Sequence, residues 1–149
     1  GILRDIGGNM KVLEKNNLEF YFQVNRIEDD FFQFCLEKEH GEHMGAISFK
    51  IHQGKAWIYS IATKPEFQHK GVGQTLIDLF ECYCANRRCY IVEGKYMPSN
   101  ESALPFYQKN GYDIYRDGYD QFIYKRLNIK KILNNFKFDI VDNLELYTL

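Results

Sequence analysis

The 149-residue sequence has no excess of charge of one sign, because 19 Lys and Arg residues are balanced by 20 Asp and Glu residues. A dedicated nucleic-acid-binding protein usually carries a clear surplus of basic residues, so this balance argues against that class. No apolar run approaches the ~20 residues that cross a bilayer, and no signal-peptide pattern opens the chain. We therefore expect a cytoplasmic protein with neither a nucleic-acid nor a membrane partner.

The four cysteines lack the paired spacing of a disulfide framework, which a chain of this size does not need. A metal site at Cys82 and Cys84 is disfavoured, because side chains two residues apart on a helix point in different directions. His40 and His43 belong to a polar, glycine-containing stretch that is typical of a solvated turn. We expect no bound metal.

The length and the 16% aromatic content predict one folded domain with its own core. The chain opens on Gly1, and Gly7-Gly8-Asn9 precede Met10. We therefore expect residues 1–9 to be a non-native extension, residues 10–127 to form the domain, and residues 128–149 to form a separate C-terminal tail.

Alternating apolar residues predict a first strand from Leu18 to Val24, and the polar segment 25–30 is typical of a turn. Further β-rich runs follow, each bounded by turn residues, at Phe31–Lys38, Met44–Ile51 and Ala56–Thr63. The first half of the domain is therefore predicted to be an antiparallel meander.

The periodicity changes after Pro65. Helical spacing of apolar residues predicts a helix from Gly71 to Asn86, and a second helix begins at Glu101 or Ser102 and ends at Gly111. Short strands are predicted at 89–93, 112–115 and 119–127. A strand–helix–strand unit after a meander indicates an α/β fold with a mixed sheet of about six to seven strands and helices on its faces.

The stretch from Gln68 to Leu76 lies between a strand and a helix and carries two glycines. Glycine lets the backbone approach a ligand closely, and the first N–H groups of a helix favour an anion such as a pyrophosphate. A Walker A loop is absent, and Leu76 stands where a dinucleotide-binding fingerprint needs its third glycine. Glu93 has the spacing of a ribose-binding acid, but the preceding meander disfavours a dinucleotide fold.

These residues resemble the GNAT superfamily of acetyl-CoA-dependent N-acetyltransferases. The signature Gln/Arg-x-x-Gly-x-Gly/Ala is met by Gln68, Gly71 and Gly73. A second motif of the family is matched, in the expected order, by Asn100, Ala103, Tyr107 and Gly111-Tyr112. The resemblance covers about Phe31 to Leu127 and identifies the domain as an acetyltransferase domain.

The resemblance implies that the strand ending at Thr63 and the strand starting near Cys89 run parallel but splay apart, with the thioester of acetyl-CoA in the gap. It implies that the pantetheine arm pairs with the backbone of Ile61, Ala62 and Thr63. The opposite wall of the site would be lined by Asn100, Ala103, Phe106 and Tyr107. The pyrophosphate would lie in a cradle formed by Gln68, His69, Lys70, Gly71, Val72, Gly73, Gln74 and Thr75.

In the reaction so implied, a neutral amine attacks the thioester, and a backbone N–H near Ile61 or Ala62 stabilises the oxyanion. Tyr107 is the candidate acid that protonates the departing sulfur, and the alternative is a plain core aromatic. Many protein-lysine-acetylating members carry Glu where this chain has Trp57. Glu93 is the best remaining carboxylate for the base, and Tyr59 or ordered water are the alternatives. A purely structural role of Glu93 is at least as open.

The tail carries an apolar stripe on a short helix, formed by Ile129, Ile132, Leu133 and Phe136. Such a stripe must be covered by the same chain or by another copy, and we expect a homodimer in which the tail contributes to the interface. Two other readings stay open: a non-catalytic module that binds or senses acyl-CoA, and a structural protein whose tail drives assembly.

Overall fold

The computed structural model describes residues 10–15, 17–97 and 102–135, and within them one sheet holds eight strands in the order β1-β2-β3-β4-β5-β6-β8-β7. Only β5 and β6 pair in parallel; every other described pair is antiparallel. The strands are β1 (Met10–Lys15), β2 (Leu18–Glu28), β3 (Phe31–Glu37), β4 (His43–His52), β5 (Lys55–Thr63), β6 (Ile91–Tyr96), β7 (Asp113–Asp117) and β8 (Asp120–Arg126).

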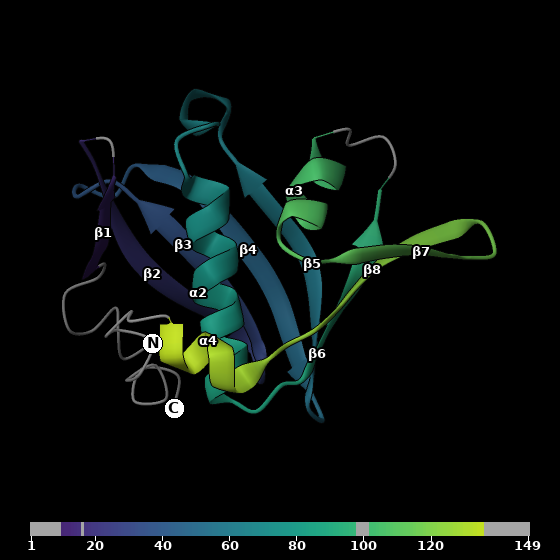
Figure 1. Ribbon diagram of the computed structural model, residues 1–149. Helices are drawn as coiled ribbons and strands as arrows, with labels where there is room; N and C mark the ends of the chain where they lie inside the picture. The colour runs from purple at the N-terminus through teal and green to yellow at the C-terminus, as the bar shows by residue number, and fades with distance from the viewer. Residues whose placement is uncertain (1–9, 16, 98–101, 136–149) are drawn as a thin grey trace.

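The described helices gather on one side of this sheet (Figure 1). They are α2 (Val72–Asn86), α3 (Ala103–Lys109) and α4 (Ile129–Asn135), with a short 3₁₀ turn, η1 (Pro65–Phe67), before α2. Helix α2 packs on β3, β4 and β5, and α4 packs on α2. We call the side of the sheet away from α2 the open face. None of the helices that the structure describes is long and apolar enough to cross a bilayer.

The predicted fold class is confirmed, and the differences are one additional strand and the ends of others. The eighth strand is β1, which the periodicity does not reveal. Segment 25–30 is largely not a turn, because β2 continues to Glu28. Its polar residues are accommodated on the open face, where the Asn25 side-chain amide donates to Gln33 Oε1 on β3 at 3.1 Å.

The core between the sheet and α2 is built largely from aromatic rings. Phe49 on β4 lies at its centre, with its ring centroid 4.9 Å from that of Phe34 and 4.7 Å from that of Phe80, both in edge-to-face geometry. Tyr83 on α2 closes the cluster against Phe34. This packing explains the aromatic-rich composition, and it fixes α2 over the middle of the sheet.

The first part of the tail is covered within the chain itself. Ile129 and Ile132 of α4 are buried and Leu133 packs partly against the same core, while Phe136 lies outside the described residues. The described part of the stripe therefore docks on α2, and not on the outer face of the sheet. The homodimer stays a prediction.

A buried ionic cluster joins α2 to the far end of the sheet. The Lys125 ammonium on β8 donates to both oxygens of Glu81 on α2, at 2.8 and 3.0 Å, and to the carbonyl of Asn110 at 2.7 Å. The Tyr112 hydroxyl donates to Glu81 Oε2 at 2.8 Å. Because Asn110 and Tyr112 directly follow α3, this cluster sets the position of α3 relative to α2.

We predict that Lys125→Met lowers the free energy of unfolding by about 3–5 kcal/mol, because it leaves the Glu81 carboxylate buried without its counter-charge. Urea denaturation measures the change. Lys95→Met is the matched control: it breaks the exposed Lys95–Asp120 pair of 3.2 Å and is expected to cost no more than about 1 kcal/mol. Equal effects of the two variants would show that the buried cluster does not hold the helices.

Candidate functional site

Strands β5 and β6 pair over only part of their length. The parallel ladder joins 55–58 of β5 to 91–94 of β6 and then stops. At this point β5 carries a bulge: Ser48 pairs with Ser60 and Phe49 with Ile58, so Tyr59 has no partner on β4. A bulge bends its strand and increases the local twist, which directs the remainder of β5 away from β6. Among the described strands, β5 is unpaired on that side from Tyr59 to Thr63.

Gly94 allows the two strands to lie close just before they part. A Cβ placed on Gly94 would lie 2.9 Å from the Ile58 carbonyl oxygen and 3.2 Å from the Ile123 side chain. Any larger residue would push β6 off β5 and shift the point of separation. This glycine is therefore explained by a close approach of strands and not by a turn.

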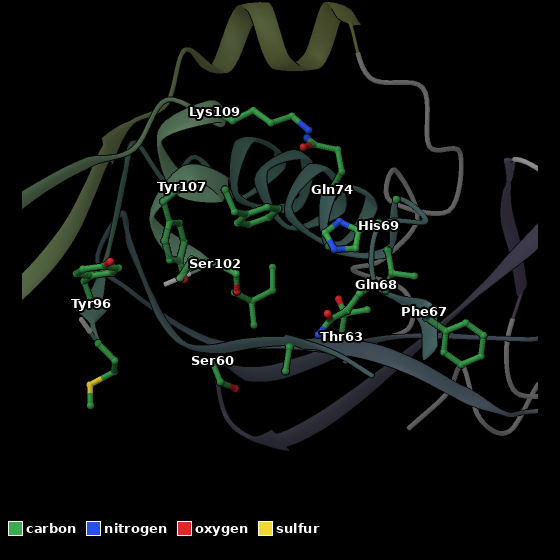
Figure 2. Close-up of a pocket in the computed structure, with 18 of the residues that line it drawn as sticks. Ser60, Thr63, Phe67, Gln68, His69, Gln74, Tyr96, Ser102, Tyr107 and Lys109 are labelled. Carbon is green, nitrogen blue, oxygen red and sulfur yellow. The ribbon is translucent and has the colours of Figure 1, made fainter. Parts of the chain in front are cut away.

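A cleft of about 620 Å³ lies at the separation, between β5, the end of β6 and the helices α2 and α3 (Figure 2). It reaches both sides of the sheet, because residues on β5 alternate between the two faces. Ser60 points away from the helices, whereas the helix side is lined by Tyr107 on α3 and Gln74 on α2 (Figure 2). The cleft thus connects the helix side of the sheet to the open face.

At one end of the cleft lies the glycine-containing loop. Gly71 is the N-cap of α2 with φ 87° and ψ 7°, and His69 also has a positive φ of 62°. The Gly71 carbonyl accepts bonds from the N–H and the hydroxyl of Thr75, at 3.0 and 2.8 Å. The first turn of α2 holds no acidic residue. Its leading N–H groups, on residues 72–74, have no intrahelical partner and lie at the positive end of the helix dipole, an arrangement that favours an anion.

A second glycine brings this helix end down onto the sheet. A Cβ on Gly45 of β4 would lie 2.7 Å from the Ala62 carbonyl oxygen and 2.9 Å from Val72 at the start of α2. The absence of a side chain at Gly45 therefore allows the start of α2 to lie close to the unpaired edge of β5.

The structure brings together most of the residues predicted for the cofactor site. Lys70 and Thr75 do not line the cleft: Thr75 is buried and bonded to Gly71, so it supports the loop from behind. Asn100 lies outside the described residues. The predicted residues that do line the cleft are Ile61, Ala62, Thr63, Gln68, His69, Gly71, Val72, Gly73, Gln74, Ala103, Phe106 and Tyr107.

Tyr107 lies on α3 and points into the cleft (Figure 2). It is only 6% exposed, and its ring contacts those of Phe106 and Tyr112 at centroid distances of 5.7 and 5.5 Å. Burial raises the pKa of the Tyr107 hydroxyl to about 12. The group therefore stays protonated throughout the physiological range and is able to donate a hydrogen bond at any working pH.

The structure does not bring Glu93 into the cleft beside Tyr107. Glu93 lines a separate hollow of about 330 Å³ on the open face, and its carboxylate lies 3.6 Å from the Lys55 ammonium. Trp57 lines the same hollow, and Tyr59 lines both the hollow and the cleft. The role of Glu93 as the base stays a prediction.

Sequence reasoning missed several lining residues. The β6 strand was expected to end at Glu93, so the residues after Gly94 were not considered, although a glycine inside a strand signals a close approach. Lys109 lies one helical turn after Phe106, and this spacing could have revealed it. The missed residues are Ser60, Phe67, Lys95, Tyr96, Met97, Ser102 and Lys109.

Solved structures with this fold include the PaiA N-acetyltransferase from Thermoplasma acidophilum in complex with coenzyme A, 26% identical with a TM-score of 0.61 over 66% of this chain and 62% of that one. This chain thus spans less than two thirds of that protein. The ribosomal-protein-S18-alanine N-acetyltransferase from Escherichia coli is 19% identical, with a TM-score of 0.57 over 65% of this chain and 68% of that one.

A cAMP-binding acyltransferase from Mycobacterium smegmatis has a TM-score of 0.75 over 98% of this chain and 55% of that one. At 11% identity this similarity shows a shared fold alone. Among curated proteins, no sequence matches significantly. The sequence profile of the acetyltransferase (GNAT) family matches residues 9–112, which is more than half of the chain. The chain belongs to the acetyltransferase (GNAT) family.

Proposed function

We propose that this protein is an acetyl-CoA-dependent N-acetyltransferase that transfers the acetyl group to a primary amine by direct attack on the thioester. The observation that carries the proposal is the combination, in one cleft, of a helix N-terminus free of acidic residues and an unpaired strand edge beside it. The known complex of the Thermoplasma relative with coenzyme A supports it.

The two ends of the cleft match two parts of acetyl-CoA, the pyrophosphate and the pantetheine arm. The N–H groups at the start of α2 would hold the pyrophosphate, with His69 and Lys70 as nearby basic side chains. The amides of the pantetheine arm would pair with the edge of β5 at Ile61, Ala62 and Thr63, as an added strand pairs with an open sheet. This pairing would place the thioester near the point where β5 and β6 separate.

The transfer needs a carbon–nitrogen bond to form and the carbon–sulfur bond to break. A neutral amine attacks the carbonyl carbon, a β5 N–H near Ile61 or Ala62 stabilises the oxyanion, and the sulfur leaves as a thiolate. The attacking nitrogen releases one proton and the thiolate takes up one, so the overall reaction needs no other reactant.

Tyr107 is the proposed donor to the departing sulfur. Because burial raises the pKa of its hydroxyl to about 12, complete transfer of its proton to a thiolate is less favourable than for an ordinary phenol. Tyr107 would therefore act mainly by donating a hydrogen bond as negative charge grows on the sulfur.

Deprotonation of the amine depends strongly on the acceptor. An alkylamine of pKa ≈ 10.4 costs roughly 4.6 kcal/mol to deprotonate at pH 7, whereas an α-amine near 7.8 costs about 1 kcal/mol. Glu93 is a carboxylate on the open face, where it pairs with Lys55 at 3.6 Å. Tyr59 and ordered water, which could carry the proton out along the cleft, remain the alternatives.

We further propose that the enzyme works in the cytoplasm, because its four cysteines are buried free thiols. We also propose that it forms a homodimer. Light scattering on the full chain tests the dimer.

The alternative function is an acyl-CoA-binding module without transfer. To distinguish it from the acetyltransferase, acetyl-CoA and a panel of amines are added and free thiol is measured: binding without thiol release would favour that module.

We predict that coenzyme A raises the melting temperature of the wild type and that Gly71→Val abolishes this shift. Valine is strained at the positive φ of Gly71, so the loop must change shape and its N–H groups turn away from the ligand. Differential scanning fluorimetry at increasing coenzyme A concentrations measures the shift. Gly118→Val is the matched control, because Gly118 also has a positive φ but lies in the distant β7–β8 turn. An undiminished melting shift in Gly71→Val would show that the loop does not bind coenzyme A.

We predict that Tyr107→Phe lowers kcat by about 10²–10³-fold and leaves the affinity for coenzyme A nearly unchanged. Because the raised pKa keeps Tyr107 protonated, kcat/KM of the wild type should rise as the amine deprotonates and show no fall up to about pH 10. Tyr119→Phe, at a fully exposed tyrosine, is the control. Equal loss of coenzyme A binding in Tyr107→Phe would indicate a packing role, and a fall near pH 9 confined to the wild type would contradict the raised pKa.

A further inference from the structure

The hollow that holds Glu93 lies on the open face, directly beside the cleft. Trp57 pairs with Lys50 on β4 and with Glu93 on β6, so the three side chains share one face of the sheet. The neighbouring positions Phe49 and Ile58 are buried on the helix side. Tyr59 lines both spaces, so the hollow adjoins the cleft at the bulge.

Two aromatic residues, Trp57 and Tyr59, line the hollow, and each packs against a further ring beside it. Trp57 lines it, with its ring centroid 6.3 Å from that of Phe122 on β8. At the cleft end, Tyr59 stacks on Phe31 of β3 with centroids 5.0 Å apart and planes 8° apart. These rings offer a flat apolar surface that leads away from the point where β5 and β6 separate.

The charge in the hollow is net positive. Its lining residues include Lys50, Lys55 and a single carboxylate, that of Glu93. Glu93 is already paired with Lys55 at 3.6 Å. Lys50 has no ion pair with any residue in the part of the chain that the structure describes, and it lies between Phe31 and Trp57 on adjacent strands. An ammonium without an ion pair, on a strand flanked by aromatic residues, favours a ligand that brings a negative charge and an apolar stem.

The position of Lys50 sets the length of that ligand. Ser60, which lines the cleft, pairs with Ser48, and Lys50 follows Ser48 by two residues on β4. Two residues of a strand span about 7 Å. An amine placed in the cleft beside Ser60 therefore lies roughly 7–10 Å from an anionic group held by Lys50, with the intervening atoms against Trp57.

We infer that the acceptor is a primary amine that carries an anionic group about 7–10 Å from the nitrogen, joined by an apolar chain, and that Lys50 selects it. The inference rests on the proposed function, because it assigns the open-face hollow to the amine substrate of the same cleft. It adds a specificity residue that no sequence motif indicated.

Three acceptors of equal chain length test the inference: 6-aminohexanoate, hexylamine and 1,6-diaminohexane. For the wild type, kcat/KM should be highest for 6-aminohexanoate, by about tenfold or more over hexylamine, because a charge-assisted contact is gained. Lys50→Met should remove this preference, and Lys50→Glu should shift it to the diamine. Lys130→Glu, an exposed charge change on α4, is the matched control and should leave the order unchanged.

Binding gives a readout that does not require turnover. Trp57 is the single tryptophan of the chain and lines the hollow, so its fluorescence reports directly on occupancy. With coenzyme A present, 6-aminohexanoate should change this fluorescence at lower concentration than hexylamine in the wild type, and not in Lys50→Met. The coenzyme A melting shift of each Lys50 variant shows that it is folded.

The outcomes separate the two proposals. Acetylation of all three amines at equal rates, with equal binding, would overturn the inference and leave the acetyltransferase function standing. Selective binding of 6-aminohexanoate that depends on Lys50, without transfer to any amine, would support the anion site and overturn the proposed function. A preference for the diamine in the wild type would overturn the inference by showing that Glu93, and not Lys50, dominates the hollow.

Discussion

The separation of β5 from β6 is the constraint on which the site depends. A parallel pair that stayed in register would close the sheet and leave nothing between its strands. Here the ladder ends at Ile58 and Gly94, where the glycine permits the closest approach and the bulge at Tyr59 turns the next residues away. Among the described strands, the β5 backbone from Tyr59 to Thr63 thereby stays unpaired on its β6 side, beside the N-terminus of α2. A free edge inside a sheet is unusual, since interior strands normally satisfy both sides.

The helices keep this opening in shape from one side only. Packing of Phe49 against Phe80 fixes α2 over the sheet, and the Glu81–Lys125 ion pair ties α2 to β8. The end of α3 joins the same cluster through the carbonyl of Asn110. Because these contacts lie away from the cleft, they hold its walls without occupying it. The open face is left to side chains that are not required for the core.

Local signals made the loop and α2 predictable, since Gly71 and Gly73 stand before a long run of helical periodicity. The end of β6 was not predictable in the same way, because the need for Gly94 arises from Ile58, a residue far away in the sequence. The register that places Glu93 beside Trp57, away from Tyr107, also depends on long-range pairing. The polar end of β2 is typical of a turn in sequence, because Gln33, which accepts the hydrogen bond of Asn25, lies on another strand.

The cradle at Gly71 is made of backbone, and the open-face hollow is made of side chains. Almost every residue carries the same backbone N–H group, whatever its side chain. Most substitutions around the loop therefore leave its hydrogen-bonding capacity intact, as long as the backbone conformation is kept. Side chains on the open face, by contrast, can be exchanged without disturbing the aromatic core on the other side. If the proposed transfer holds, divergence of this scaffold would therefore change the acceptor more readily than the acyl donor.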